Sequence, residues 1–211
     1  MQVSLDLMEF IEQQILPRYN QFDPAHNISH ANAVIRRSLQ IADKIGADPN
    51  MVYVVAAYHD LGLSGPRAIH HVTGAKILAA DKRLCKWFST EQIRIMQEAV
   101  ADHRASAAHA PRSLYGRIVA EADRDLRPEI VFRRTVQFGL SHYPELDQEQ
   151  QWERFKQHIQ HKYGPSGYIH LWIENSENQT NLAQLRKIIS DEKELRQAFL
   201  RFYQEERCYK E

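Results

Sequence analysis

The stretch whose residue types could do chemistry is His59-Asp60, two polar residues at the end of a predicted core helix. Residues 51–58 are apolar on every side of the helix that Asp48 and Pro49 are expected to begin. The last turn of such a helix carries both polar side chains into or beside the interior. A buried, unpaired carboxylate is costly, and the C-terminal end of a helix disfavours negative charge. Asp60 therefore needs a cation nearby, and a metal ion would supply it.

Two further polar residues lie on the apolar stripes of other predicted helices. His30 lies on the inner stripe of a helix expected from about residue 27 to residue 46, and Asp123 lies on the apolar face of a later helix. The short connection 47–48 makes an antiparallel hairpin, which brings His30 near His59. Two imidazoles and two carboxylates suit a divalent transition metal better than calcium, and an octahedral ion would keep two open positions. The sequence therefore predicts a catalytic metal site formed by His30, His59, Asp60 and Asp123.

The elements that must position these residues are helices, because the hydrophobic pattern follows the helical period along the chain. We expect a loop at 63–69, a helix that opens at 70–75, and a helix begun by a capping box at 89–92. The inner stripe of that last helix extends to His103. His70 and His103 are therefore also expected beside the four residues above.

The rest of the sequence predicts additional helices. We expect them at 128–140, at 147–163 and, as a pair, from about 180 to residue 211, while 168–173 favours a short strand or a helical turn. The predicted architecture is an all-α helical bundle in a single domain, 1–211. Its motif-bearing core covers about 26–126, and a C-terminal helical extension covers about 128–211.

Composition excludes several classes of protein. Lysine plus arginine equals aspartate plus glutamate at 27 each, which argues against binding of extended nucleic acid and favours a small anionic partner. The sequence has no run of about 20 apolar residues, so we expect no membrane partner. Residues 1–6 lack the pattern of a secretory signal, and the two cysteines form no CxxC motif, so we expect a cytoplasmic protein without a disulfide framework. The oligomeric state is not predicted.

The order of the four candidate ligands is H…HD…D, and with it the chain resembles the HD-domain superfamily of metal-dependent phosphohydrolases over roughly residues 26–126. The similarity to the small bacterial phosphohydrolases of this family extends to further segments, namely Leu61-Gly62 after the HD pair, His70-His71-Val72-Thr73-Gly74-Ala75, His103-Arg104-Ala105-Ser106 and Glu121-Ala122-Asp123. Three positions depart from the family pattern: Asn27, Ala33 and Glu121. These departures concern positions around the metal and the substrate.

The resemblance implies a fold and an activity. The fold is an HD-domain helical bundle, and the activity is hydrolysis of a small phosphorylated substrate. The sequence lacks the Glu-Asp pair of the guanosine-tetraphosphate hydrolases and the Gly-Tyr-Pro motif of the cyclic-dinucleotide hydrolases. A nucleotide phosphatase or pyrophosphohydrolase is therefore expected. The implied cofactor is one divalent transition metal per chain (Mn, Fe, Co, Ni or Zn, with Mg less suited).

Particular residues are assigned to the expected reaction. Asp60, His70 and His103 are the candidate catalytic residues. The candidate contacts to substrate phosphate are His70, His71, His103, Arg104 and Lys76, with Arg67 and Arg112 also near the motifs. On the plainer interpretation, each inward polar residue is a core group satisfied by a local hydrogen bond. That interpretation alone is assigned to His26, His109, His142, His158, His161 and His170.

Two other functions remain open. Diiron oxygenases of the same fold have sites that resemble H…HD…H…H…D, and His70 with His103 could complete such a pair. A non-catalytic HD module that only binds a ligand is the second alternative. Modules of that kind usually lose a metal ligand, whereas this sequence keeps all four.

Overall fold

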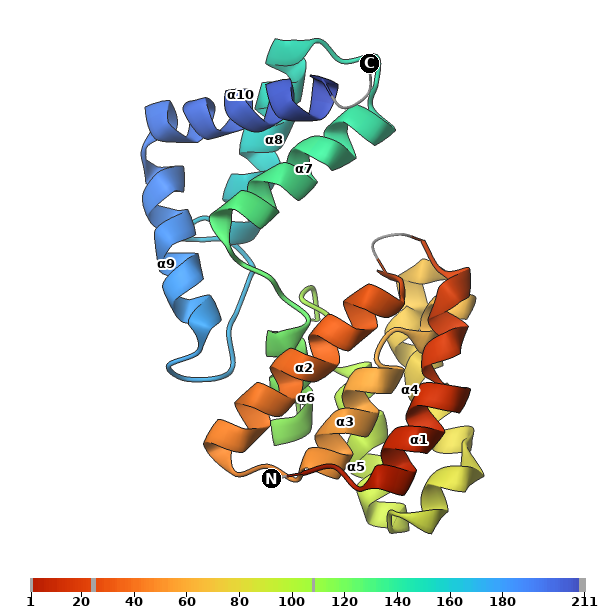
Figure 1. The fold of residues 1–211 in the computed structure, drawn as a ribbon. Coiled ribbons are helices and arrows are strands. Elements are labelled where there is room, and N and C mark those ends of the chain that lie inside the picture. Colours follow the sequence, from red (N-terminus) through yellow and green to blue (C-terminus); the bar gives the residue numbers. More distant parts are fainter. Residues whose placement is uncertain (1, 24–25, 108, 209–211) are drawn as a thin grey trace. The chain divides into compact units, whose positions relative to one another are not determined.

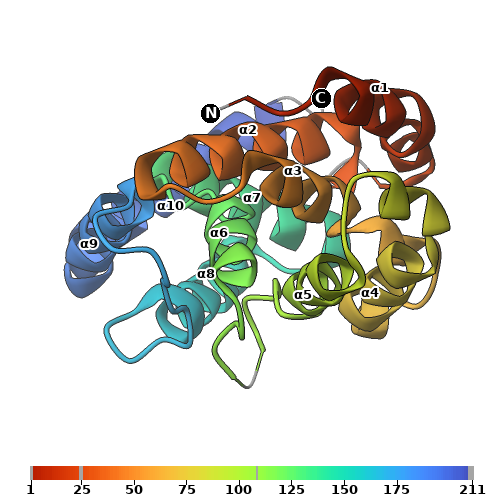
Figure 2. The same cartoon turned by 90° about the horizontal axis from the view of Figure 1, so that it is seen from below.

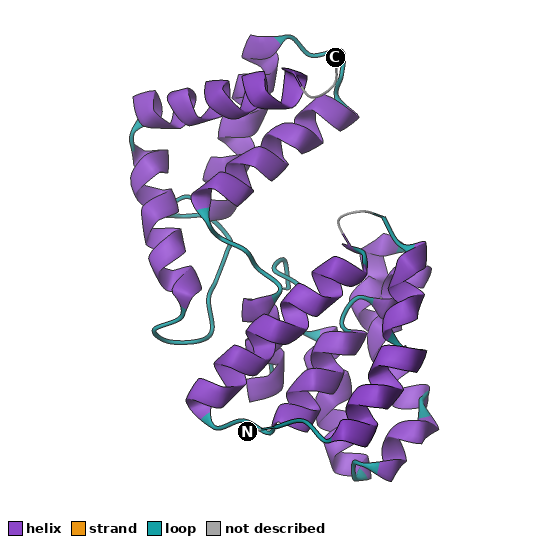
Figure 3. Cartoon of the chain, viewed as in Figure 1, coloured by secondary structure: helices purple, strands orange, loops and turns teal. Residues whose placement is uncertain are grey.

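The computed structural model describes residues 2–23, 26–107 and 109–208, and these form helices and connecting loops without any strand (Figures 1 and 3). The prediction of an all-α fold is confirmed. The chain divides into two compact units, Met1–Arg124 and Asp125–Glu211, called here the N-terminal and C-terminal units. The prediction that the whole chain is one domain stays a prediction. Among the described residues, no helix is long and apolar enough to cross a membrane.

The described residues of the N-terminal unit form six α-helices and several short 3-10 turns. Its elements in chain order are α1 (Leu5–Gln14), η1 (Leu16–Gln21), α2 (Ile28–Ile45), α3 (Pro49–Tyr58), η3 (Leu61–Ser64), η4 (Arg67–Ile69), α4 (His70–Ala80), η5 (Lys82–Lys86), α5 (Thr90–Ala101) and α6 (Leu114–Ala122). The predicted loop at 63–69 therefore consists largely of 3-10 turns. The capping box predicted for α5 is present, with Ser89 and Gln92 bonded reciprocally.

Helix α3 is the centre of the N-terminal unit. Every residue from Met51 to Tyr58 is buried, and α3 packs against α1, α2, α5 and α6 (Figure 2). The sequence ends α2 and starts α3 as predicted, because Gly46 takes a left-handed conformation with φ of 74° and the Asp48 side chain accepts a hydrogen bond from the Asn50 amide. The α2–α3 hairpin thus brings the start of one helix beside the end of the next.

The C-terminal unit contains α7 (Pro128–His142), α8 (Gln148–Tyr163), α9 (Glu177–Ser190) and α10 (Glu192–Cys208). Its core is aromatic: the Trp152 and Phe155 rings of α8 both pack against the Phe199 ring of α10. The helices agree with the predicted ranges to within a few residues.

The segment 168–173 corrects one prediction, because it is neither a strand nor a helical turn. The backbone amides of Tyr168 and Ile169 donate to carbonyls of His161 and Lys162 in the last turn of α8. These hydrogen bonds fold the chain back onto the end of the helix and use donors that a strand would offer to a neighbouring strand. The apolar run that favoured a strand is explained by burial of Ile169 and Ile173 within an irregular loop.

Candidate metal centre

The four predicted ligands converge at one place in the N-terminal unit. His30 Nε2 lies 3.1 Å from Asp123 Oδ1 and 3.3 Å from His59 Nε2. His59 Nε2 in turn lies 3.2 Å from Asp60 Oδ2. The His59 side chain is fully buried, whereas those of His30 and Asp123 are 14% and 27% exposed. The group is therefore reached by solvent from the side of His30 and Asp123.

Helix ends place these side chains. His59 is the C-cap of α3, Asp123 is the C-cap of α6, and His30 lies in the first turn of α2, where Asn27 caps the helix. The helix predicted to carry Leu126 ends earlier, at Ala122, so Asp123 follows the helix rather than lying within it. Termini of three helices therefore meet around the His59-Asp60 pair.

His70 and His103 form a second pair on the other side of Asp60. Their Nε2 atoms lie 3.3 Å from each other, and each lies 3.5 Å from Asp60 Oδ1. Asp60 thus presents Oδ2 to His59 and Oδ1 to His70 and His103. We refer to the six residues as the cluster: His30, His59, Asp60, His70, His103 and Asp123.

Three imidazoles of the cluster share one local arrangement. The Nδ1 atoms of His59, His70 and His103 lie 2.7 to 2.8 Å from the backbone carbonyls of Ala56, Arg67 and Val100, each three residues earlier. A carbonyl only accepts, so Nδ1 carries the proton and Nε2 of the neutral ring keeps its lone pair. All three lone pairs face Asp60 or a neighbouring imidazole, which is the arrangement that a metal ion needs.

Two glycines allow α4 to approach the end of α3. A Cβ atom added to Gly62 would lie 1.8 Å from the His70 carbonyl oxygen, and one added to Gly74 would lie 3.2 Å from the His59 carbonyl oxygen. Any side chain at Gly62 would collide with the backbone of α4. The glycines that follow the HD pair and the His70-His71 pair in the sequence thus bring His70 to Asp60.

The electrostatics of the cluster favour a bound cation. Burial opposes the charged forms, but the imidazoles of His59, His103 and His30 outweigh it and hold the pKa of Asp60 well below its usual range. The pKa of Asp123 is lowered in the same way, against burial, chiefly by His30. Burial likewise disfavours charged His30, but Asp123 and Asp60 raise its pKa to about 9. Both carboxylates are therefore anionic at neutral pH and hold protons on nearby imidazoles, which a divalent ion would replace.

The pKa of His70 is lowered, so this ring is biased towards the neutral state. Burial lowers the pKa of His70, and the neighbouring His103 and Arg104 add to this effect, against the hydrogen bond to the Arg67 carbonyl. Its Nε2 atom is therefore an acceptor at neutral pH, available to a proton or to a metal ion.

The predicted phosphate contacts are placed unequally. The Arg104 guanidinium donates to the Ala68 carbonyl at 2.8 Å and lies 3.5 Å from His71 Nδ1, so both residues border η4 next to His70. Lys76 is exposed on α4 and, among the described residues, makes no hydrogen bond or ion pair with the cluster. Arg112 is bound to the buried Asp102 carboxylate, 2.8 Å away. The phosphate roles of these residues stay predictions.

The sequence pattern missed two residues that hold the backbone of the cluster. Arg37 Nε donates to the Ala122 carbonyl, next to Asp123, at 2.6 Å, and the Tyr19 hydroxyl contacts the backbone at Ala57 and Asp60. Arg37 follows His30 by seven residues, so the helical period could have placed both on one face of α2. Tyr19 lies in a short 3-10 turn and carries no periodic signal.

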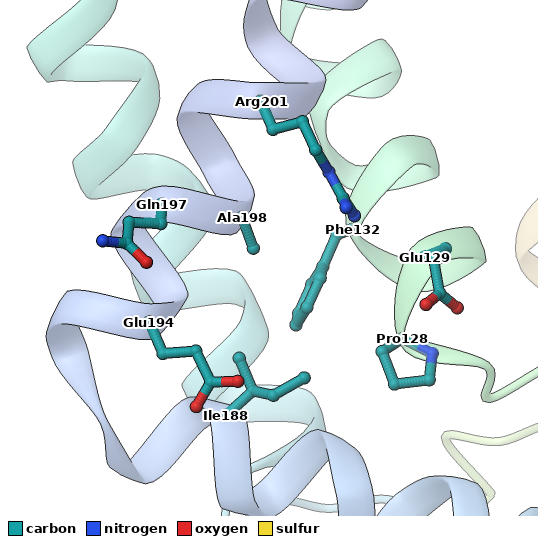
Figure 4. Close-up of a pocket in the computed structure, with 8 residues that line it drawn as sticks. All are labelled: Pro128, Glu129, Phe132, Ile188, Glu194, Gln197, Ala198 and Arg201. Atoms are coloured by element: carbon teal, nitrogen blue, oxygen red, sulfur yellow. The ribbon is translucent and has the colours of Figure 1, made fainter.

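A pocket of about 320 Å³ lies apart from this chemistry, in the C-terminal unit (Figure 4). Phe132 points into it, and Glu129, Glu194 and Arg201 stand around it. None of the cluster residues lines this pocket.

Among the described residues, two groups of side chains could hold a metal ion. The first consists of His30, His59 and Asp60, and the second consists of Asp60, His70 and His103.

Comparison with known families agrees with the geometry. The model of the HD domain matches residues 27–127. This part of the chain is an HD domain. The matched range runs from the N-cap of α2 past Asp123, so it contains the whole cluster. No protein in the curated set matches the chain.

Two solved structures are similar to the chain. Bacillus subtilis YpgQ, in a complex with ADP, has a TM-score of 0.55 at 18% sequence identity, and the match covers 88% of this chain and 90% of that one. A predicted HD superfamily hydrolase from an uncultured Thermotogales bacterium has a TM-score of 0.48 at 22% identity, with 72% and 82% covered. At these identities the similarity to YpgQ supports the fold of the HD-domain protein described here.

Proposed function

We propose that this HD-domain protein is a metal-dependent phosphohydrolase that acts on a small phosphorylated substrate, with a nucleotide as the preferred class. The observation that carries the proposal is the cluster itself. Within it, His30, His59, Asp60 and Asp123 offer two imidazoles and two carboxylates, which suit a transition metal, and one side of this group is open to solvent. A closed structural site would leave no room for substrate.

One divalent ion is proposed in this four-residue group. Its two carboxylates balance the charge of one divalent ion, whereas the group around His70 and His103 shares Asp60 and adds no carboxylate of its own. When bound, the ion would polarise a phosphoryl oxygen and lower the pKa of a bound water. Mn, Fe, Co, Ni and Zn fit this ligand set better than Mg, which prefers oxygen ligands.

The residues of the chain would handle the proton. His70 and His103 both present Nε2 beside Asp60, and either ring in its neutral form can accept the proton released by an attacking water. The protonated ring can then donate to a phosphate oxygen, as the hydrogen-bonding role predicted from the sequence requires. Arg104 borders η4 next to His70, where its positive charge would stabilise the phosphate, and His71 lies beside both residues.

The nucleotide class rests on two supports of different kinds. Balanced overall charge and the motif comparison favour a small anionic substrate over an extended nucleic acid. YpgQ, which shares the fold, was crystallised with ADP, so nucleotides are the first compounds to test.

The proposal is tested by a substrate screen. The protein is loaded with Mn²⁺ and incubated with nucleoside mono-, di- and triphosphates while phosphate and pyrophosphate are followed separately. We expect metal-dependent release of one of these products. No release from any phosphorylated compound by a protein that binds the metal would contradict the proposal.

The second histidine pair also keeps the diiron oxygenase as an alternative. Asp60 Oδ1 and the lone pairs of His70 and His103 are a set of donors for a second ion that shares Asp60 with the first. Two irons per chain together with oxygen consumption would favour that function over hydrolysis.

A further inference from the structure

Tyr19 lies beside the cluster although its segment is outside the matched domain, which begins at residue 27. Pro17 lies at the start of η1, and Tyr19 in the same 3-10 turn is buried with 0% exposure. Its ring packs against Phe22 and lies 6.3 Å from the His59 ring, centroid to centroid. A buried phenol at this position needs partners for its hydroxyl group.

The Tyr19 hydroxyl has a donor role and an acceptor role. It donates a hydrogen bond to the Ala57 carbonyl at 3.0 Å and accepts one from the Asp60 backbone amide at 3.3 Å. A phenol hydroxyl can donate one hydrogen bond and accept another, so both contacts form at the same time. One buried group therefore holds the backbone on both sides of Tyr58 and His59.

These contacts occur where α3 would otherwise end without partners. The last carbonyl groups of a helix have no intrahelical donor. At the end of α3, the Ala56 carbonyl receives the Nδ1 proton of His59, and the Ala57 carbonyl receives the hydroxyl proton of Tyr19. The same hydroxyl accepts a hydrogen bond from the Asp60 amide, so the direction of the Asp60 side chain depends on the Tyr19 hydroxyl.

We propose that Tyr19 is a positioning residue of the metal centre, whose hydroxyl fixes the His59-Asp60 backbone so that both side chains face one ion. The inference rests on the proposed metal-dependent function. The hydrogen bonds of the Tyr19 hydroxyl join it to backbone atoms of Ala57 and Asp60. It acts on the backbone that carries two adjacent ligands, as outer partners of metal ligands do.

The chain offers a matched control in Tyr58. Tyr58 is also fully buried, and its hydroxyl donates to Asp81 Oδ2 at 2.8 Å. Tyr58→Phe therefore removes one buried hydroxyl from the same unit without touching the backbone of the metal ligands. Tyr19→Phe keeps the ring and its packing and removes only the hydroxyl.

The test measures the affinity for Mn²⁺ and the visible absorption spectrum of the Co²⁺-loaded protein, in the wild type and in both variants. We expect Tyr19→Phe to weaken Mn²⁺ binding by about 10- to 100-fold and to change the Co²⁺ spectrum. Tyr58→Phe should stay within about threefold of the wild type and keep its spectrum. Equal binding in Tyr19→Phe and the wild type, or equal losses in the two variants, would overturn the inference alone. A wild-type protein that binds neither ion would overturn the proposed function and the inference with it.

If Tyr19→Phe does not fold, the inference can still be tested by a measurement on the wild-type protein. Hydrogen exchange of the Asp60 backbone amide is followed with and without Zn²⁺. We expect the Asp60 amide to be protected from exchange before the ion is added, because it already donates to the Tyr19 hydroxyl. An Asp60 amide that exchanges as fast as an exposed one in the metal-free protein would overturn the inference.

Discussion

At the scale of single residues, Asp60 is the carboxylate that lies beside all four histidines of the cluster. Its two carboxylate oxygens face separate histidines, with Oδ2 towards His59 and His30 and Oδ1 towards His70 and His103. A carboxylate in this position can orient both pairs at once. Asp60 could be singled out from the sequence because burying a carboxylate at a helix C-terminus costs free energy unless a cation or several hydrogen-bond donors lie nearby.

Replacing Asp60 by Asn should abolish metal binding and hydrolysis. The amide keeps the shape of the side chain but removes the charge that attracts the ion, so we expect activity to fall by about a thousandfold or more while the protein stays folded. Metal content and turnover are the measurements. Asp81→Asn serves as the control, because Asp81 is also a hydrogen-bonded carboxylate in this unit but contacts Tyr58 and Arg83. An Asp60→Asn variant that unfolds without metal would mean that the residue is structural.

Metal affinity should rise as the pH is raised from about 6.5 to about 9. Without metal, the pKa of His30 is raised to about 9, so a proton competes with the ion up to that pH. The stability that this proton gives the metal-free protein is complete below the unfolded pKa of about 6.5 and is lost as the pH rises through about 9. Calorimetric titration with Mn²⁺ at several pH values measures the affinity, and a gain of up to about tenfold per pH unit is expected for one displaced proton. An affinity that does not depend on pH in this window would contradict the assignment of His30.

His103→Ala should separate metal binding from turnover. If one ion is bound by His30, His59, Asp60 and Asp123, the variant keeps its metal content and loses most of its turnover, because His103 acts on the proton. Metal analysis and steady-state kinetics measure the two effects. A wild-type content of two ions that falls to one in the variant would instead make His103 a ligand and reopen the diiron alternative.

At the scale of elements, close approach of α4 to the end of α3 decides whether His70 reaches Asp60. Gly62→Ala should reduce stability by about 3 kcal/mol, because its Cβ would overlap the His70 carbonyl. Gly65→Ala is the control in the same turn, since its Cβ would meet nothing nearer than 3.6 Å. Urea unfolding of both variants measures the difference. Equal stability of the two would show that α4 can move away without loss.

Most of the elements could be predicted because their signals are local. Asp48 with Pro49 begins α3, Gly46 ends α2, and the Ser89 capping box begins α5, and each acts through hydrogen bonds within a few residues. The segment 168–173 was mispredicted because its apolar side chains are equally compatible with a buried loop. Its backbone partners lie in α8, and no pattern within the segment indicates them.

At the scale of the whole molecule, the four metal-ligand candidates could be predicted because each lies within a helix of clear apolar pattern or just after its end. Two of the supporting contacts could not be predicted in the same way. Tyr19 reaches the site from a short 3-10 turn, and Arg104 donates to the carbonyl of Ala68, which lies 36 residues earlier. Contacts between segments far apart in the sequence depend on tertiary packing, which the period of a single helix does not encode.

The most direct test of the central claim is nucleotide hydrolysis by metal-free protein titrated with Mn²⁺. We expect no release of phosphate or pyrophosphate in the presence of chelator. With added metal, release should grow and saturate near one ion per chain. Full hydrolysis in chelator, by protein shown to contain no metal, would contradict the claim that the cluster is a catalytic metal centre.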